Sequence, residues 1–231
     1  MGKYEEAYRL ITGHSFQTWE GAEGKITTQF KLSLLEMARK CLGDNNASRA
    51  RELLNEALSY PENLGEGRLE GTKDNHIYYN LGLACEMLGQ EEGAGECFKK
   101  ATEGAMEVAG MMYYYDQPAD MILYQGLGFE KLGDKKAANS RFYRLLDFGE
   151  QHIRDKFVMD YFAVSMPDMS VFDADMDSKN AAHCYYVMGL ANIGLGNKEL
   201  ALQNFDKVLG LDPAHQNAII YRKMAGEIEV Q

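Results

Sequence analysis

The pattern of small, apolar and polar positions along the chain repeats three times. Each copy has a glycine, a second glycine seven residues later, an alanine twelve residues after the first glycine and a phenylalanine sixteen residues after it. The four positions are Gly82, Gly89, Ala94 and Phe98 in the first copy, Gly126, Gly133, Ala138 and Phe142 in the second, and Gly189, Gly196, Ala201 and Phe205 in the third. Four fixed positions in three ungapped copies indicate an internal repeat.

Each copy predicts a helical hairpin. The second glycine permits the left-handed conformation that ends a helix, so one helix precedes it and another follows. The first glycine and the alanine lack bulk, and we expect them where the two helices touch. The phenylalanine is expected to fill the space between successive hairpins. The sequence therefore predicts an all-α fold, a helical-hairpin solenoid (α-α superhelix) with long inserts between repeats.

The repeats are expected at 75–106, 119–150 and 182–213, and weaker units flank them. Residues 25–61 form a degenerate repeat whose turn is predicted at Leu42, Gly43 and Asp44. Residues 1–12 are interpreted as the orphan second helix of a truncated repeat, which suggests a piece of a longer protein. Residues 214–230 are expected to form a capping helix with Pro213 in its first turn. The whole chain, 1–231, is expected to be a single repeat domain.

The spacing resembles the tetratricopeptide repeat (TPR). In that repeat small residues occupy the glycine and alanine positions, an aromatic residue follows four positions later and a proline often closes the unit. Pro213 closes the third copy in this way, and the first two copies lack the proline. The resemblance implies that the first helix of each hairpin lines a concave surface that receives peptides.

One face of these first helices carries the candidate binding residues, which follow each other at helical spacing. They are His76, Tyr79, Leu83 and Glu86; Asp120, Leu123 and Glu130; and His183, Tyr186 and Leu190. A second interpretation stays open. The inserts fold into the groove, and its histidines and tyrosines are then core contacts, which is common where their polar ends are hydrogen-bonded.

The inserts carry a more specific resemblance. Residues 18–25 (TWEGAEGK), 59–69 (SYPENLGEGRL), 113–127 (YYYDQPADMILYQGL) and 160–168 (DYFAVSMPD) resemble the C-terminal TPR region of large bacterial proteins. Those proteins begin with a β-rich domain, DUF5107. The resemblance implies that the helical part makes contacts rather than performs chemistry, and that the β-rich domain of the parent chain is a candidate partner.

Two groups of insert residues are candidate contacts. Glu20 and Glu23 beside Trp19 suit either paired carboxylates or an aromatic platform for a sugar. In the alternative, Trp19 anchors a loop on the solenoid and the glutamates face solvent. The second group is Tyr114, Asp116 and Gln117. The sequence offers no further catalytic partner for either group, so no catalytic residue is predicted.

A metal site is not predicted. Asp173, Asp175 and Asp177 have the spacing of a calcium loop, but Ser178 stands where that loop needs glycine and Cys184 where it needs glutamate. We expect Asp177 or Ser178 to cap the next helix instead. The five histidines never pair at one helical turn, so neither a zinc motif nor any other cofactor is predicted.

Charge and composition narrow the class of partner. The formal net charge of −11 disfavours nucleic acid, which is bound through cations. The polar start of the chain and the absence of a CxxC pair predict the cytoplasm. Residues 180–197 lack charged side chains, but His183, Asn192 and three glycines argue against a membrane span.

These observations predict a noncatalytic scaffold or docking module for protein or peptide, with a homodimer as one option. Two alternatives remain. One is the accessory helical half of a carbohydrate-active or carbohydrate-binding multidomain protein. The other is a small-ligand receptor that uses its aromatic inserts.

Overall fold

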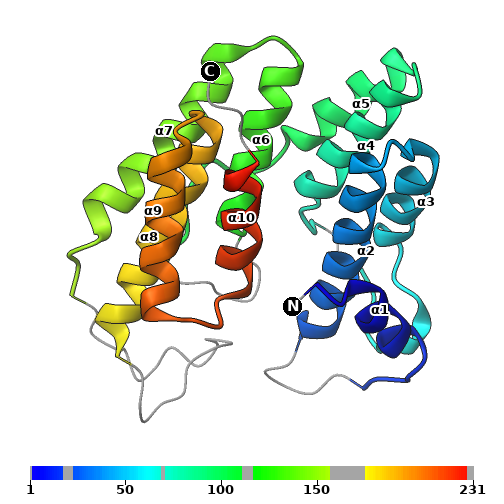
Figure 1. The fold of residues 1–231 in the computed structure, drawn as a ribbon, viewed down its shortest axis with the longest axis horizontal. Coiled ribbons are helices and arrows are strands. Elements are labelled where there is room, and N and C mark those ends of the chain that lie inside the picture. Colours follow the sequence, from blue (N-terminus) through cyan, green and yellow to red (C-terminus); the bar gives the residue numbers. More distant parts are fainter. Residues whose placement is uncertain (1, 18–22, 69–70, 111–116, 157–174, 228–231) are drawn as a thin grey trace. The chain divides into compact units, whose positions relative to one another are not determined.

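The computed structural model describes residues 2–17, 23–68, 71–110, 117–156 and 175–227 (Figure 1). Within these ranges the chain forms ten α-helices and one short 3-10 helix, and it contains no strand. The helices are α1 (Tyr4–Thr12), α2 (Lys25–Gly43), α3 (Ala47–Ala57), η1 (Glu62–Leu64), α4 (Asn75–Met87), α5 (Glu91–Ala101), α6 (Ala119–Lys131), α7 (Lys135–His152), α8 (Met176–Gly194), α9 (Lys198–Leu211) and α10 (Gln216–Gly226). The prediction of an all-α fold is confirmed.

The described chain divides into two compact units, and the expectation of a single repeat domain stays a prediction. Unit 1 is Met1–Glu103 and unit 2 is Gly104–Gln231. The division falls at the start of the irregular segment between α5 and α6, which matches the general rule that unit boundaries fall in connections crossed by few contacts.

Unit 1 contains the hairpins α2/α3 and α4/α5, with α1 beside α2 and α3 beside α4. Its core includes Phe30, Leu34, Leu54 and Ile77, all fully buried. The segment after α1 is tied to η1 through Asn63, whose side chain donates to the carbonyl of Ile11 at 2.9 Å. The backbone carbonyl of Asn63 in turn accepts from the Phe16 amide at 2.8 Å.

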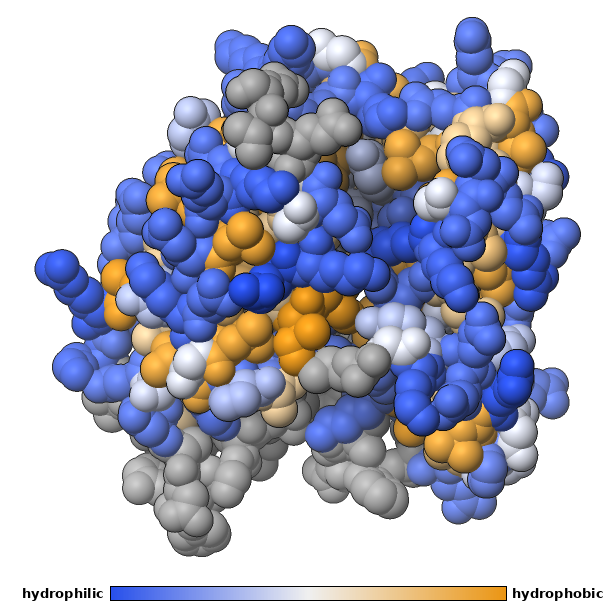
Figure 2. All heavy atoms as spheres, in the orientation of Figure 1, coloured by the Kyte–Doolittle hydropathy of each residue, from blue (hydrophilic) through white to orange (hydrophobic). Residues whose placement is uncertain are grey.

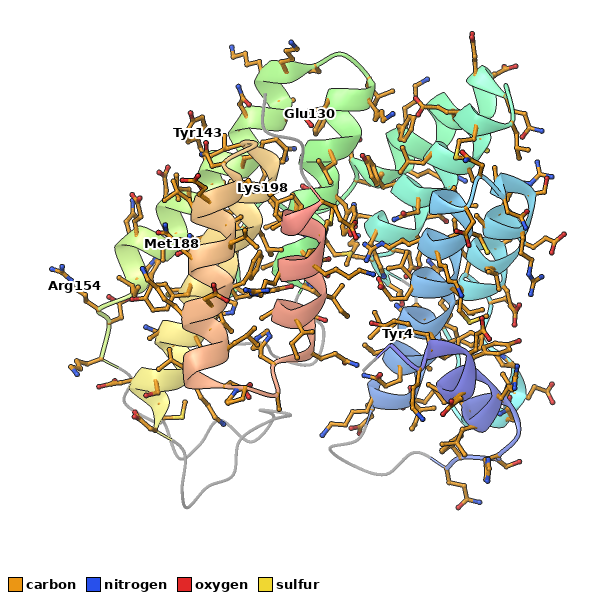
Figure 3. All side chains as sticks on the ribbon, in the orientation of Figure 1. Tyr4, Glu130, Tyr143, Arg154, Met188 and Lys198 are labelled. Carbon is orange, nitrogen blue, oxygen red and sulfur yellow. The ribbon has the colours of Figure 1, made fainter. Side chains whose placement is uncertain are left out.

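Unit 2 contains the hairpins α6/α7 and α8/α9, and α10 packs beside α8 and α9. Tyr124, Phe142, Leu145 and Phe205 are fully buried in its core. Helix α7 approaches α8 closely at Gly149, where a Cβ atom would lie 2.4 Å from Cγ of Met188 (Figure 3).

In all three strong repeats the phenylalanine ring lies on the first glycine of the same hairpin. A Cβ atom on that glycine would stand 2.2–2.6 Å from a ring carbon, too close for any side chain. The pairs are Gly82 with Phe98, Gly126 with Phe142, and Gly189 with Phe205. The rings thus lie inside their hairpins rather than only between hairpins, because the glycine leaves room there. Phe142 does both, since it also contacts Gly194 in the next hairpin.

The second glycine of each strong repeat ends the first helix as predicted, with φ of 71° at Gly89, 82° at Gly133 and 73° at Gly196. The degenerate repeat differs. Gly43 belongs to α2, and the left-handed residue is Asn45 with φ 58°. Asparagine tolerates this conformation better than most residues, so α2 extends through Gly43 and the turn follows at Asp44 and Asn45.

Residues 2–11 match the second half of the repeat pattern, whereas the last helix begins later than predicted. Gly2, with φ 95°, and the buried Ile11 stand at the same offsets from Ala7 as Gly89 and Phe98 do from Ala94. At the other end α10 begins at Gln216 and is capped by the side chain of His215. Pro213 therefore precedes the helix instead of lying in its first turn.

Candidate functional site

The candidate residues of unit 1 form a stripe along α4, which we call the α4 stripe: His76, Tyr79, Leu83 and Glu86. Their spacing of three, four and three residues places them on one face of the helix. His76, Tyr79 and Leu83 are half-buried, and Glu86 is exposed. The stripe is therefore a mixed surface, apolar in its middle and acidic at its C-terminal end.

Tyr79 and Leu83 rest on the core of their own hairpin. They pack against a buried cluster of Cys85, Ala94 and Phe98. The rings of Tyr79 and Phe98 are tilted, with centroids 5.9 Å apart. This contact holds the Tyr79 ring in place while leaving part of it accessible.

His76 differs from the other members of the stripe because its Nδ1 atom is buried. Burial, with a smaller contribution from the positive charge of Lys31, lowers the pKa of His76 to about 3. The imidazole is therefore neutral at pH 7 and contributes no charge to the stripe.

The corresponding residues of unit 2 are placed differently. Asp120 and Leu123 on α6, and Tyr186 and Leu190 on α8, are all buried. His183 is half-buried and Glu130, at the end of α6, is exposed (Figure 3). Desolvation raises the pKa of Glu130 above its ordinary value.

Helix α10 covers this face of unit 2 through Tyr221. The Tyr221 hydroxyl donates a hydrogen bond to the buried carboxylate of Asp120 at 2.9 Å. Its ring lies 6.0 Å from the ring of Tyr186, 6.4 Å from Tyr124 and 6.5 Å from Phe205. Burial, and then the negative charge of Asp120, raise the pKa of Tyr186 well above its ordinary value.

The segment that follows unit 1 in the chain also covers part of this face. The His183 ring bonds through Nε2 to the carbonyl oxygen of Ala109 at 2.8 Å and meets Phe148 edge-on at 5.9 Å. Burial lowers the pKa of His183. In unit 2, therefore, Tyr186 is buried against α10, which is not one of the inserts, and the half-buried His183 contacts the insert that contains Ala109.

Among the insert candidates, Gln117 and Glu23 lie in the part of the chain that the structure describes. The Gln117 side chain accepts from the Ala105 amide at 3.1 Å and donates to the Ala105 carbonyl at 2.7 Å. It therefore fastens its own loop. Glu23 is exposed. Trp19, Glu20, Tyr114 and Asp116 lie outside the described residues.

The aspartates before α8 serve as a helix cap. Asp175, rather than Asp177 or Ser178, is the cap, and it accepts from the Ser178 amide at 3.1 Å and from the Ser178 hydroxyl at 2.6 Å. These bonds hold the pKa of Asp175 below its ordinary value. Asp173 lies outside the described residues, and within them no cluster of three His, Cys, Asp or Glu residues is placed to hold a metal ion.

Two tyrosines at the unit 2 face escape sequence reasoning. Tyr124 belongs to the second repeat, four residues after Asp120, and Tyr221 lies in the helix expected only to cap the array. The signal for Tyr221 is its spacing from Ala218 and Ala225, three and four residues away, which marks the buried face of α10.

The comparisons with known proteins identify the repeat. Residues 76–103 and 182–215 match the family model described as tetratricopeptide repeat. They correspond to α4/α5 and to most of α8/α9 with the turn that follows. These two hairpins therefore match the tetratricopeptide repeat, and the expectation drawn from the glycine, alanine and phenylalanine spacing is confirmed for them.

Three solved structures show weak overall similarity to the chain. "Crystal structure of MamA protein" is 16% identical over the whole of both chains, with a TM-score of 0.30. "Crystal structure of YrrB: a TPR protein with an unusual peptide-binding site" is 18% identical over 84% of this chain and 92% of that one, with a TM-score of 0.28. "MamA RS-1 ArsTM double mutant" is 15% identical over 86% and 93%, with a TM-score of 0.29.

No helix in the described ranges has the length and apolar character needed to span a bilayer. Helix α8, which contains the uncharged stretch 180–197 almost entirely, fits this finding, because its buried side chains include Asn180 and Asn192.

Proposed function

We propose that the chain is a noncatalytic docking module that binds a protein partner through the α4 stripe. The observation that carries the proposal is the half-exposed state of Tyr79 and Leu83 on a hairpin that matches the tetratricopeptide repeat. Solenoids of this kind use an extended face of their first helices for binding. The equivalent positions on α8, Tyr186 and Leu190, are buried and are not offered to a partner.

The chemistry of the stripe favours an amphipathic helix with an apolar anchor and a basic residue. The apolar side chains of Tyr79 and Leu83 suit the anchor, and the exposed carboxylate of Glu86 suits the base. The net charge of −11 attracts the same kind of partner over longer range. Hydrophilic residues cover most of the face seen in Figure 2.

Unit 2 supplies an internal example of such a contact. Helix α10 places Tyr221 against Tyr186, the counterpart of Tyr79, and the next two residues in its sequence are Arg222 and Lys223. A helix with an aromatic anchor is thus already accepted at the homologous position, and its Arg222 forms an ion pair with Asp206 of α9. This supports a helical partner for the α4 stripe.

The test is selection of helical peptides on the whole chain. A displayed library of amphipathic peptides is selected on the wild type, and the affinities of the selected peptides are then measured for variants. Tyr79→Ala should weaken binding about 30-fold, since a central anchoring aromatic is worth about 2 kcal/mol. Tyr143→Ala is the matched control, because Tyr143 is 52% exposed on α7 (Figure 3).

Tyr186→Ala separates docking from packing. Tyr186 is buried against Tyr221 and Phe205, so its removal should cost about 3 to 5 kcal/mol of folding stability. Peptides that bind Tyr79→Ala as tightly as the wild type would contradict docking at the stripe. Melting of Tyr79→Ala at the temperature of Tyr186→Ala would assign Tyr79 to the core instead.

We also propose particular partners for the chain and a cellular compartment for it. The resemblance to the C-terminal region of DUF5107 proteins makes a β-rich domain one candidate partner. A second copy of the chain is another, since Leu10 on α1 is 61% exposed. The four cysteines are free thiols, which suits the reducing cytoplasm. Sedimentation of a monomer at micromolar concentration would remove the second copy from the proposal.

A further inference from the structure

A small hollow lies beside the start of α4, away from the α4 stripe. Its volume is about 190 Å³. Every residue around it belongs to unit 1. The lining consists of Arg68, Thr72, Lys73, Asp74, Asn75, Tyr78, Lys100 and Glu103.

A buried ion pair forms one wall of the hollow. The carboxylate of Asp74 has no solvent exposure, and it is held by Lys31 Nζ at 3.1 Å and by Arg68 Nη2 at 2.9 Å. Arg68 Nε approaches the same carboxylate at 3.2 Å. The negative charge of Asp74 is therefore shared by two cations, which leaves this wall with one positive charge in excess.

Asparagine and lysine side chains complete the hollow. Asn75 Nδ2 donates to the carbonyls of Ala101 at 2.7 Å and Glu103 at 2.6 Å, so the start of α4 is fastened to the end of α5. Lys100 lies with Nζ 5.2 Å from the centre of the Tyr78 ring. Such bonds fix the walls before a ligand arrives, which lowers the entropic cost of binding.

Lys73 and Lys100 have charges that nothing in the described ranges neutralises. Both side chains are exposed, and neither forms an ion pair among the described residues. Arg68, Lys73 and Lys100 line the hollow together with Asp74 and Glu103, three positive charges against two negative ones. Lys31 does not line the hollow, but it adds a fourth positive charge through its ion pair with Asp74. Among these described residues the positive charges therefore outnumber the negative ones, on a chain whose formal net charge is −11.

The size of the hollow restricts what it accepts. Sites for drug-sized molecules usually occupy about 300 to 1,000 Å³, so this hollow suits a single charged group on a short stem rather than a nucleotide. Lys73 and Lys100, the two lining lysines without an ion pair among the described residues, together match a dianion better than a carboxylate. Lysine and arginine are also the usual partners of phosphate.

We propose that the hollow formed by Arg68, Lys73 and Lys100 binds the dianionic phosphate monoester of a small molecule or a modified side chain. The proposal is independent of docking at the α4 stripe, because it rests on other residues. The shared chemistry is the phosphate group. O-phosphoserine and glycerol 3-phosphate distinguish its two possible sources, a phosphorylated protein and a phosphorylated metabolite.

The experiment titrates the whole chain with inorganic phosphate, O-phosphoserine, glycerol 3-phosphate and acetate, followed by amide chemical shifts. Saturable shifts are expected for the three phosphates at residues 72–78, with acetate at least tenfold weaker. Tighter binding of O-phosphoserine than of glycerol 3-phosphate would identify a phosphorylated protein as the source, and the reverse order a metabolite. If acetate bound as tightly as the phosphates, the proposed preference for a dianion would be overturned.

A charge-matched pair of double variants tests the location. Lys73→Gln/Lys100→Gln should weaken phosphate binding at least tenfold. Lys40→Gln/Lys99→Gln removes the same charge from two exposed lysines of unit 1 that do not line the hollow, and it should change the affinity less than twofold. Equal losses in both variants, or no saturable binding by the wild type, would overturn the proposal.

Discussion

At Gly126 a missing side chain determines how closely two helices pack. Phe142 occupies the space that a Cβ would fill, with Cε1 only 2.2 Å from that position. Gly126→Ala should therefore lower the free energy of unfolding by about 1 to 3 kcal/mol through overpacking. This loss should exceed the gain of up to about 1 kcal/mol that alanine brings to a helix. Denaturant unfolding of the variant measures the balance.

Gly95 is the control at the same scale. It lies inside α5, and nothing stands within 4 Å of the position where its Cβ would be. Gly95→Ala should therefore raise the free energy of unfolding by about 0.5 to 1 kcal/mol, the ordinary preference of a helix for alanine over glycine. Stabilisation by both alanines would show that Phe142 moves aside at no cost, and the close approach at Gly126 would then be incidental.

Among the elements, α10 depends on one side chain more than on the others. Tyr221 joins it to Tyr124, Tyr186 and Phe205, and to the carboxylate of Asp120. Tyr221→Ala should lower the free energy of unfolding by about 3 to 5 kcal/mol. It should also speed hydrogen exchange throughout α10.

Tyr221→Phe isolates the hydrogen bond within this contact. It keeps the ring but leaves the buried Asp120 carboxylate without the hydroxyl, at a cost of about 1 to 3 kcal/mol. Arg222→Ala is the neighbouring control, because Arg222 is exposed and its contact to Asp206 is a surface ion pair. If Tyr221→Phe were as stable as the wild type, the hydrogen bond would contribute nothing to holding α10.

The elements also show how far sequence reasoning reaches. Glycine spacing predicts the hairpins and their turns because the left-handed turn residue and the glycine under the phenylalanine are local requirements of the backbone. The same reasoning misplaces the turn after α2, because Asn45 adopts the left-handed conformation and Gly43 does not. The sequence alone does not show which residues of the predicted binding face are covered by other parts of the chain. Tyr79 and Tyr186 share one position in the repeat, and α10 distinguishes them through a contact between distant parts of the chain.

At the scale of the whole molecule, the two compact units should unfold as two cooperative transitions. Each has a core of its own, with Leu54 fully buried in unit 1 and Leu145 in unit 2. Leu54→Ala should destabilise the transition of unit 1 by about 2 to 5 kcal/mol, and Leu145→Ala should act by a similar amount on unit 2 alone. Solenoid stability is a sum of local terms, so damage to one hairpin reaches its neighbours only through their interfaces. Calorimetry of the wild type and of both variants measures the transitions. Hydrogen exchange in α3 and in α7 assigns them to unit 1 and unit 2. A single transition that moves equally in both variants would show that residues 1–231 fold as one cooperative unit.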